Sequence, residues 1–139
     1  MSKTIELLSD AELLAAPESE YMSEAQLASF RQRLLAEESA LRSAANATTQ
    51  HLQETEAAPD PTDRASAEEE HTLELRVRDR ERRLLKKIAQ ALHRIEDRSY
   101  GWCEESGEPI GIARLLARPT ASLCLEAQER HEAKKRQYG

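Results

Sequence analysis

Two aspartates stand in a proline-stiffened turn between two long stretches with helical pattern. Asp60 and Asp63 carry carboxylates, which are hard oxygen ligands for a divalent cation and also bind basic surfaces. Each aspartate also has a simpler local role. Asp63 can cap a helix, and Asp60 can form an Asx turn before Pro61. A change to asparagine separates the two roles, because asparagine caps a helix as well as aspartate does.

Two cysteines have the spacing of half a zinc module. Cys103 is followed three positions later by Ser106, and Cys124 by Ala127, where a four-cysteine site would have its second ligands. A closed structural zinc site needs four ligands, mostly thiolate or imidazole. His131 could add one nitrogen, which still leaves the set incomplete. The ligand count therefore argues against bound zinc, and with no export signal the two thiols are expected to stay reduced.

The composition argues against several classes of protein. The 139 residues are 33% charged and 39% hydrophobic, with a net charge of -6, which is typical of long exposed helices. An acidic chain is not expected to bind DNA by itself, and no apolar run approaches the length of a membrane span. The sequence shows no Ser-His-Asp set, phosphate loop or glycine-rich nucleotide motif. We therefore expect a cytoplasmic protein that is not an enzyme.

Three stretches with capping-box spacing predict where helices begin. Ser9, Ser23 and Ser66 are each followed three residues later by Glu or Gln. We expect a short helix after the first serine, ending before Pro17, and a long helix after each of the other two. Pro61 disfavours helical backbone in the residue before it, so the first long helix should end by about residue 57.

Heptad repeats on both long helices predict an antiparallel coiled-coil hairpin over residues 22–98, with its tip at 58–65. Glu74 and Glu81 occupy tip-side positions of the second seam, so we expect the tip-side half to be the less stable one. The arginine-rich run 76–83 indicates either a solvated face or a side that meets an acidic or phosphate surface. The seam residues of the first helix are Leu27, Phe30, Leu34, Leu41, Ala44, Thr48 and Leu52, and those of the second are Val77, Leu84, Ala91, Ile88 and Ile95.

The segments on either side of the hairpin are expected to differ in size. Residues 1–21 should form an N-terminal segment with the short helix. Residues 99–139 should form a small globular base with a degenerate zinc-finger-like loop region, followed by a C-terminal helix from about Thr120. In place of zinc, we expect hydrogen bonds from Ser106 and apolar packing to hold the base, with the apolar contacts coming from Trp102, Ile110, Ile112 and Leu123. The predicted fold class is mainly α.

Several long strings of this sequence resemble the DksA/TraR family, and the resemblance covers roughly residues 20–137. The strings are long and specific, and together they mark the chain as similar to the cysteine-poor, zinc-independent DksA paralogues. They are the tip segment Pro59-Asp60-Pro61-Thr62-Asp63-Arg64-Ala65, the helical strings at 68–70, 73–82 and 95–97, and the base strings Tyr100-Gly101-Trp102-Cys103, Gly107-Glu108-Pro109-Ile110-Gly111-Ile112 and Ala117-Arg118-Pro119-Thr120-Ala121.

The resemblance implies a monomeric bacterial regulator that binds RNA polymerase through its secondary channel and acts at promoters with the alarmone ppGpp. It implies that Asp60, Asp63 and Ala65 act at the tip near the polymerase active site. Lys87 and Arg118 match positions that help form the ppGpp site between factor and polymerase. Gln128 stands where many relatives have lysine, a departure that bears on the strength of alarmone dependence. Cys103 and Cys124 match two of four zinc ligands, which Ser106 and Ala127 leave incomplete.

Two other functions remain open at this point. A Gre-like transcript-cleavage factor also uses an acidic-tipped coiled coil, and its carboxylates would hold a catalytic magnesium. A coiled-coil adaptor would instead self-associate through the seam and would have no affinity for polymerase. Cleavage of RNA in backtracked complexes and co-sedimentation with core polymerase distinguish these readings.

Overall fold

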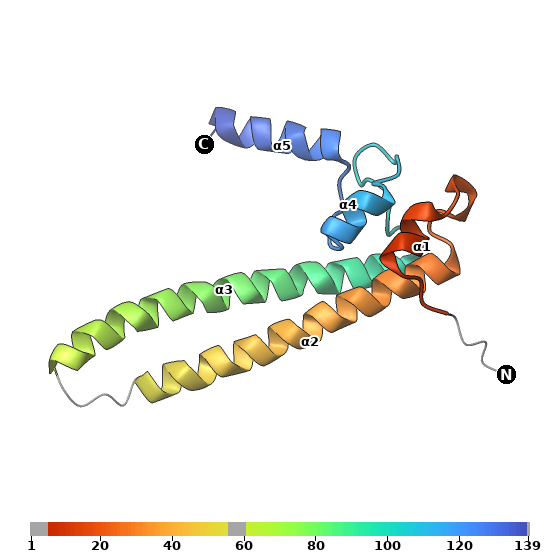
Figure 1. Cartoon of the computed structure of the whole chain (residues 1–139). Coiled ribbons are helices and arrows are strands. Elements are labelled where there is room, and N and C mark those ends of the chain that lie inside the picture. The colour runs from red at the N-terminus through yellow and green to blue at the C-terminus, as the bar shows by residue number, and fades with distance from the viewer. Residues whose placement is uncertain (1–5, 56–60, 139) are drawn as a thin grey trace. The chain divides into compact units, whose positions relative to one another are not determined.

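The described part of the chain is a succession of helices (Figure 1). The computed structural model describes residues 6–55 and 61–138, and no named strand occurs in those ranges, as the mainly α class predicts. The elements are α1 (Asp10–Ala15), the 3-10 helix η1 (Glu18–Glu20), α2 (Glu24–Thr55), α3 (Pro61–Asp97), α4 (Ile112–Ala117) and α5 (Leu125–Tyr138).

The chain divides into two compact units, and both long helices contribute to each. The core unit contains Met1–Leu35 and Ala89–Gly139, and the seam unit contains Ala36–Ile88. Within each unit α2 and α3 lie side by side and run antiparallel, as the predicted hairpin requires (Figure 1).

The three capping-box predictions have different outcomes. The box at Ser9 is confirmed, because the Ser9 hydroxyl accepts from the Glu12 N–H while the Glu12 carboxylate accepts from the Ser9 N–H. Ser23 accepts from the Gln26 N–H at 3.3 Å, but the Gln26 side chain accepts from Met22 instead. The box at Ser66 is wrong as a helix start. The helix α3 begins five residues earlier at Pro61, where proline suits the first helical position because its missing N–H would have no partner.

The C-terminus of α3 is closed by a Schellman motif without glycine. Arg98 adopts a left-handed conformation with φ of 69°. The Ser99 N–H donates to the Arg94 carbonyl at 2.9 Å, and the Arg98 N–H donates to the Ile95 carbonyl at 3.3 Å. The helix therefore ends at Asp97, one residue before the predicted end of the hairpin at residue 98.

The core unit is built around apolar side chains from several elements. Tyr100 is fully buried, its ring lies 5.6 Å from the ring of Phe30, and its hydroxyl donates to the Pro119 carbonyl at 2.7 Å. Trp102, which the sequence placed in this core, is instead 39% exposed and rests edge-on against Tyr21. Ile112 and Leu123 are only half-buried. The buried apolar residues of the core unit are Leu13, Leu27, Phe30, Leu34, Ala91, Ile95, Tyr100, Cys103, Ile110, Leu115, Ala121 and Ala127.

A close backbone approach explains why glycine occupies position 101. Gly101 has φ of +89°, and a Cβ there would lie 2.5 Å from the Met22 sulfur. The Tyr21 hydroxyl donates to the Gly101 carbonyl at 2.5 Å and accepts from the Gly111 N–H at 2.9 Å. Burial raises the pKa of this tyrosine, which keeps the hydroxyl protonated as a donor. The Tyr21 side chain thus connects the N-terminal segment to Gly101 and Gly111, which lie at the two ends of the loop before α4.

The base contains a helix that the sequence did not predict. Helix α4 spans six residues after Gly111, and the last helix begins at Leu125 instead of near Thr120. Among the described residues, no helix is long and apolar enough to cross a membrane.

Candidate functional site

The residues assigned to the tip lie at the start of α3. Asp60 lies outside the described residues, and Asp63 and Ala65 are placed by their backbone alone, in the first turns of α3. Because the helix begins at Pro61, Asp63 is inside the first turn and is not the N-cap. A carboxylate there faces the positive end of the helix dipole, so its charge is favourable at this position.

The seam unit buries polar side chains between its two helices. Glu81 is 9% exposed, and its carboxylate accepts a 3.5 Å hydrogen bond from the Thr48 hydroxyl. Glu74 pairs with His51 across the seam. The second carboxylate oxygen of each glutamate is buried without a hydrogen-bond partner in the described structure. Buried unpartnered oxygens are unfavourable, so this seam is held weakly.

Apolar side chains of α3 in the same unit point outward, contrary to the sequence prediction. Val77 and Leu84, predicted to lie in the seam, are 47% and 37% exposed. With Leu73 they form an exposed row at helical spacing, which we call the apolar ridge. Only the row of Glu74 and Glu81, which the sequence also placed in the seam, faces the other helix, because a two-helix contact buries one narrow stripe of each helix.

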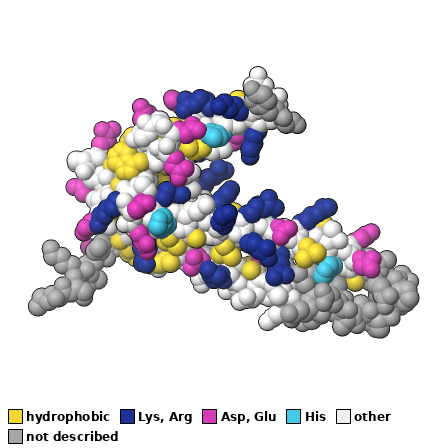
Figure 2. Space-filling model, turned by 180° about the vertical axis from the view of Figure 1, so that it is seen from behind, with side chains coloured by type: hydrophobic (Ala, Val, Ile, Leu, Met, Phe, Trp, Pro, Cys, Tyr) yellow, Lys and Arg dark blue, Asp and Glu magenta, His cyan; other side chains and the backbone are white. Residues whose placement is uncertain are grey.

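Basic side chains run beside the apolar ridge on α3. We call this set the basic ridge: Arg76, Arg80, Arg83 and Lys87, all exposed and spaced by three or four residues. Figure 2 shows blue side chains in a row with hydrophobic ones between them along the long helices. A face that combines arginine with exposed leucine and valine is suited to a partner that is acidic and partly apolar.

The region that resembles a zinc finger is held by backbone hydrogen bonds. The Cys103 N–H donates to the Glu108 carbonyl at 2.8 Å, and the Gly107 N–H donates back to the Cys103 carbonyl at 2.9 Å. The Glu104 N–H donates to the Ser122 carbonyl at 2.9 Å, which joins the two half-modules. These backbone bonds connect the two ends of the 103–108 loop and join it to the segment before α5.

Polar groups converge on the Cys103 thiol. Burial raises its pKa, but hydrogen bonds from the Ser106 hydroxyl and from the backbone amides of Cys124, Ser106 and Glu105 outweigh burial and lower the pKa to about 6. Backbone N–H groups aimed at sulfur stabilise the thiolate. The loop thus favours the thiolate form of Cys103.

The donor set does not fit zinc. The Ser106 hydroxyl lies 3.9 Å from the Cys124 sulfur, and Ala127 is a fully buried residue with no donor atom. Among the described residues, no group of three or more His, Cys, Asp or Glu side chains is placed to hold a metal ion. Ser106 also accepts from the Glu108 N–H at 3.3 Å, as the expected role in loop hydrogen bonding requires.

His131 binds the loop instead of completing a metal site. Its imidazole pairs with the Glu105 carboxylate, and Arg130 lies 3.8 Å from the same carboxylate. The hydrogen bond to His131 lowers the pKa of Glu105, with the nearby charges adding to the effect. This contact fastens the 103–107 loop to α5.

The residues matched to the alarmone site are divided between the units. Arg118 is the exposed C-cap of α4, and Gln128 is a half-buried residue of α5 whose amide donates to Glu132 at 3.2 Å. Both belong to the core unit, whereas Lys87 is exposed on α3 in the seam unit.

Sequence reasoning missed the side chains that hold the base loops by long-range bonds to carbonyls. Arg94 donates to the Thr120 carbonyl at 3.2 Å, and Arg114 donates to the Leu123 carbonyl at 3.0 Å. Tyr21 acts in the same way on Gly101. No local pattern marks such residues, because their partners are 9 to 80 positions away.

Two family models match this chain and together cover most of it. The model described as "DnaK suppressor protein DksA, N-terminal domain" matches residues 26–95, and the model "Prokaryotic dksA/traR C4-type zinc finger" matches residues 98–133. The second match includes the two positions where cysteine is replaced.

Curated and solved relatives agree with these matches. The "RNA polymerase-binding transcription factor DksA" of Caulobacter vibrioides is 56% identical over 84% of this chain and 82% of its own length. The protein of that name from Escherichia coli is 52% identical over 87% of this chain and 81% of its own length. The solved structure of "transcription factor DksA2 from Pseudomonas aeruginosa" is 46% identical, with a TM-score of 0.85 over 92% of this chain and 99% of that one.

Proposed function

The chain belongs to the DksA/TraR family, and from that premise we propose that it is a non-enzymatic transcription regulator that binds RNA polymerase. The observation that carries the proposal is the 56% and 52% identity to curated RNA polymerase-binding factors over more than four fifths of the chain. The two family-model matches, over residues 26–95 and 98–133, include most of both long helices and of the base.

We place the polymerase contacts on the seam unit. The tip residues Asp60, Asp63 and Ala65 enter the secondary channel and act near the active site. The basic ridge and the apolar ridge meet the channel wall, where arginine pairs with carboxylates and the leucine and valine side chains are removed from water. The weakly held polar seam supports this role, because a helix pair of low stability adapts to the shape of its partner.

The proposal includes ppGpp as an effector in the complex with polymerase. Lys87 and Arg118 supply cationic contacts to its phosphates, and both side chains are exposed in the free protein. Gln128 contributes no charge, and its amide is engaged with Glu132. We therefore expect weaker alarmone dependence than in relatives with lysine at this position.

The proposal also includes activity without zinc. The hydrogen-bonded loop around Cys103 and the pairing of Glu105 with His131 support it, because both are made entirely by the chain. The relevant test is promoter-specific transcription in vitro with and without ppGpp, in the presence of a metal chelator. Chelator-resistant inhibition of a ribosomal promoter is expected. Loss of inhibition in chelator, restored by zinc, would refute the zinc-independent part alone.

Polymerase binding is tested separately by co-sedimentation with core enzyme. A one-to-one complex is expected, and a chain that instead self-associates and leaves polymerase free would support an adaptor. RNA cleavage in backtracked complexes should stay at the level without factor, because the proposal assigns no catalytic metal to the tip.

The variant Asp63→Asn tests the charge at the tip. Loss of one carboxylate near the helix N-terminus should weaken α3 by only about 0.5 kcal/mol, while promoter inhibition should be lost. Asp79→Asn, an exposed aspartate of the same helix, is the matched control and should inhibit normally. Normal inhibition by Asp63→Asn with unchanged polymerase binding would overturn a charge-based role.

A further inference from the structure

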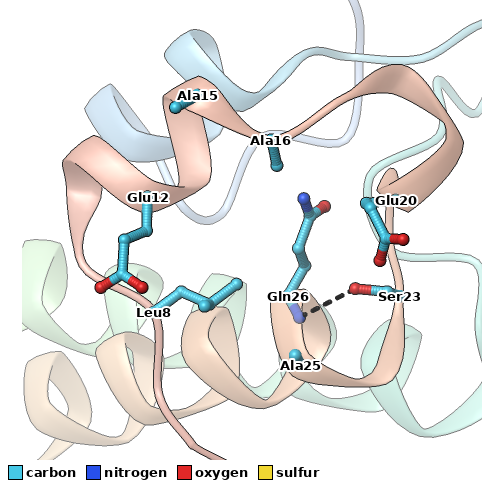
Figure 3. A pocket seen from close by; sticks show the side chains of 8 residues that line it. All are labelled: Leu8, Glu12, Ala15, Ala16, Glu20, Ser23, Ala25 and Gln26. Atoms are coloured by element: carbon cyan, nitrogen blue, oxygen red, sulfur yellow. Dashed lines mark hydrogen bonds between the residues drawn. The ribbon is translucent and has the colours of Figure 1, made fainter.

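A pocket of about 420 Å³ lies within the core unit between α1, η1 and the start of α2 (Figure 3). Its apolar wall consists of Leu8, Ala15, Ala16 and Ala25. All of the residues that line it lie between positions 8 and 26. The pocket is therefore formed by a single short stretch of one unit, apart from every residue assigned above to polymerase or ppGpp.

Gln26 presents an unused hydrogen-bond donor to this pocket. The residue is 1% exposed, and its Oε1 accepts from the Met22 N–H at 2.8 Å. Because the Met22 group is a donor, the atom that faces it must be the amide oxygen, so the NH₂ group is directed elsewhere. In Figure 3 the amide nitrogen points into the space below Ala16. No hydrogen bond of this nitrogen to another described residue is found, and the atom is not fully buried, so an acceptor brought by a ligand would take the place of water there.

Two carboxylates make the pocket electrically negative. Glu12 comes from α1 and Glu20 from η1, on two sides of the opening (Figure 3). Glu12 uses one oxygen to accept from the Ser9 N–H, which leaves the other oxygen available. None of the described residues that line the pocket is basic. A cation therefore complements this site, and an anion does not.

We propose that this pocket binds a lysine or arginine side chain of an extended peptide segment from a partner protein. The aliphatic stem lies along the wall formed by Leu8, Ala16 and Ala25, as long basic side chains do on apolar surfaces. The charged head reaches Glu12 or Glu20. A backbone carbonyl of the peptide accepts from the Gln26 Nε2 and replaces water at that nitrogen.

The inference goes beyond polymerase regulation, and it is tested on the full chain alone. In an NMR titration of the ¹⁵N-labelled protein, the peptide acetyl-Gly-Arg-Gly-amide should shift the side-chain NH₂ signals of Gln26 and the backbone signal of Ala16. The shifts should saturate at low millimolar concentration, about 1–5 mM, as suits a single side-chain contact. The same peptide with lysine should act similarly. Peptides with norleucine or glutamate in place of arginine should leave these signals unmoved.

Matched variants distinguish the effect of the Glu20 carboxylate on peptide binding from the effect of general surface charge. Glu20→Gln should weaken binding about threefold, because it removes one exposed charge contact. Glu18→Gln makes the same change on the same 3-10 helix outside this pocket and should bind as the parent does. Ala16→Leu should fill the space and weaken binding at least about tenfold. If Ala16→Leu alters thermal melting, the comparison of Glu20→Gln with Glu18→Gln still tests whether the carboxylate at the pocket binds the peptide.

Three results would overturn the proposal: equal shifts with the norleucine peptide, equal effects of Glu18→Gln and Glu20→Gln, or no saturable shift of Gln26 up to about 10 mM peptide. Each result is independent of polymerase binding, so failure here leaves the proposed transcriptional role intact.

Discussion

The core unit and the seam unit contain segments of the same two helices, yet the described residues that they bury differ: the core unit buries mainly apolar side chains, whereas the seam unit buries Glu81 as well as Ile88. In the core unit, Phe30, Leu34 and Tyr100 are fully buried. In the seam unit, Glu81 is 9% exposed, while Val77 and Leu84 face the solvent. Apolar burial stabilises by about 25 cal/mol per Å², whereas a buried carboxylate with an unpartnered oxygen destabilises. The difference predicts that the core unit is the more stable of the two.

A single heptad row shows how the units differ. Val77, Leu84 and Ala91 occupy equivalent positions, but only Ala91, in the core unit, is buried. The core unit contains α1, α4 and α5 as well as the long helices, so more of each helix surface is covered there. Two helices alone cover one narrow stripe, and the rest of the row becomes a surface.

The largest expected effect is in the core unit. Tyr100→Ala removes a fully buried ring and should lower the free energy of unfolding by about 3–5 kcal/mol. Tyr100→Phe keeps the ring, loses the bond to the Pro119 carbonyl, and should lower it by about 1 kcal/mol. Urea unfolding followed by the fluorescence of Trp102, the single tryptophan of the chain, measures both. Equal midpoints for the two variants would contradict a core centred on this ring.

In the seam unit, replacing a buried side chain should raise stability instead of lowering it. Glu81→Leu replaces a buried carboxylate with an apolar side chain and should stabilise the seam by about 1–2 kcal/mol. Hydrogen exchange of the α3 amides between residues 70 and 88 should slow accordingly. Leu84→Gln, at an exposed position of the apolar ridge, is the control and should change this exchange by less than about 0.5 kcal/mol. Faster exchange in Glu81→Leu would show that the polar seam is stabilising.

A smaller effect is expected at Trp102. Its 39% exposure and edge-on contact with Tyr21 limit the loss in Trp102→Ala to about 1 kcal/mol, far from the unfolding of the base that a buried position would give. Thermal melting followed by circular dichroism measures the change. A loss of stability as large as that of Tyr100→Ala would show that Trp102 is a core residue.

The finest distinction concerns pH. The thiol pKa of Cys103 is about 6 in the folded chain against 9.0 in its ordinary state. The unfolded state therefore binds more protons between these values, so the stability of the core unit should rise as pH increases from about 6 to 9. The contribution is complete above about 9 and is lost as pH falls through about 6.

Denaturant titrations across this pH window, compared between variants, test the assignment. Cys103→Ser should remove the rise, and Cys124→Ser should retain it, because the Cys124 contact to this thiol comes from its backbone N–H. An equal pH dependence in both variants would place the titrating group elsewhere.

Most of the helical framework was predictable because its signals are local. The reciprocal bonds of Ser9 and Glu12 and the end of α3 at Asp97 follow from neighbouring residues. The start at Ser66 was wrong because Pro61 supplies an equally local start signal five residues earlier. The turn and the heptad repeats placed the tip at residues 58–65, the resemblance supplied the roles of its residues, and these roles stay predictions.

By itself the sequence determined the mainly α class, the two long helices and the absence of a four-cysteine ligand set, since these depend on residue type and spacing alone. Tertiary structure decided which heptad row is covered, that Trp102 lies outside the core, and that amide groups converge on Cys103. It also decided that the Gln26 amide nitrogen faces a pocket whose lining includes Glu12 and Glu20. These features arise where segments distant in sequence meet, and periodicity along one helix carries no information about what packs against it.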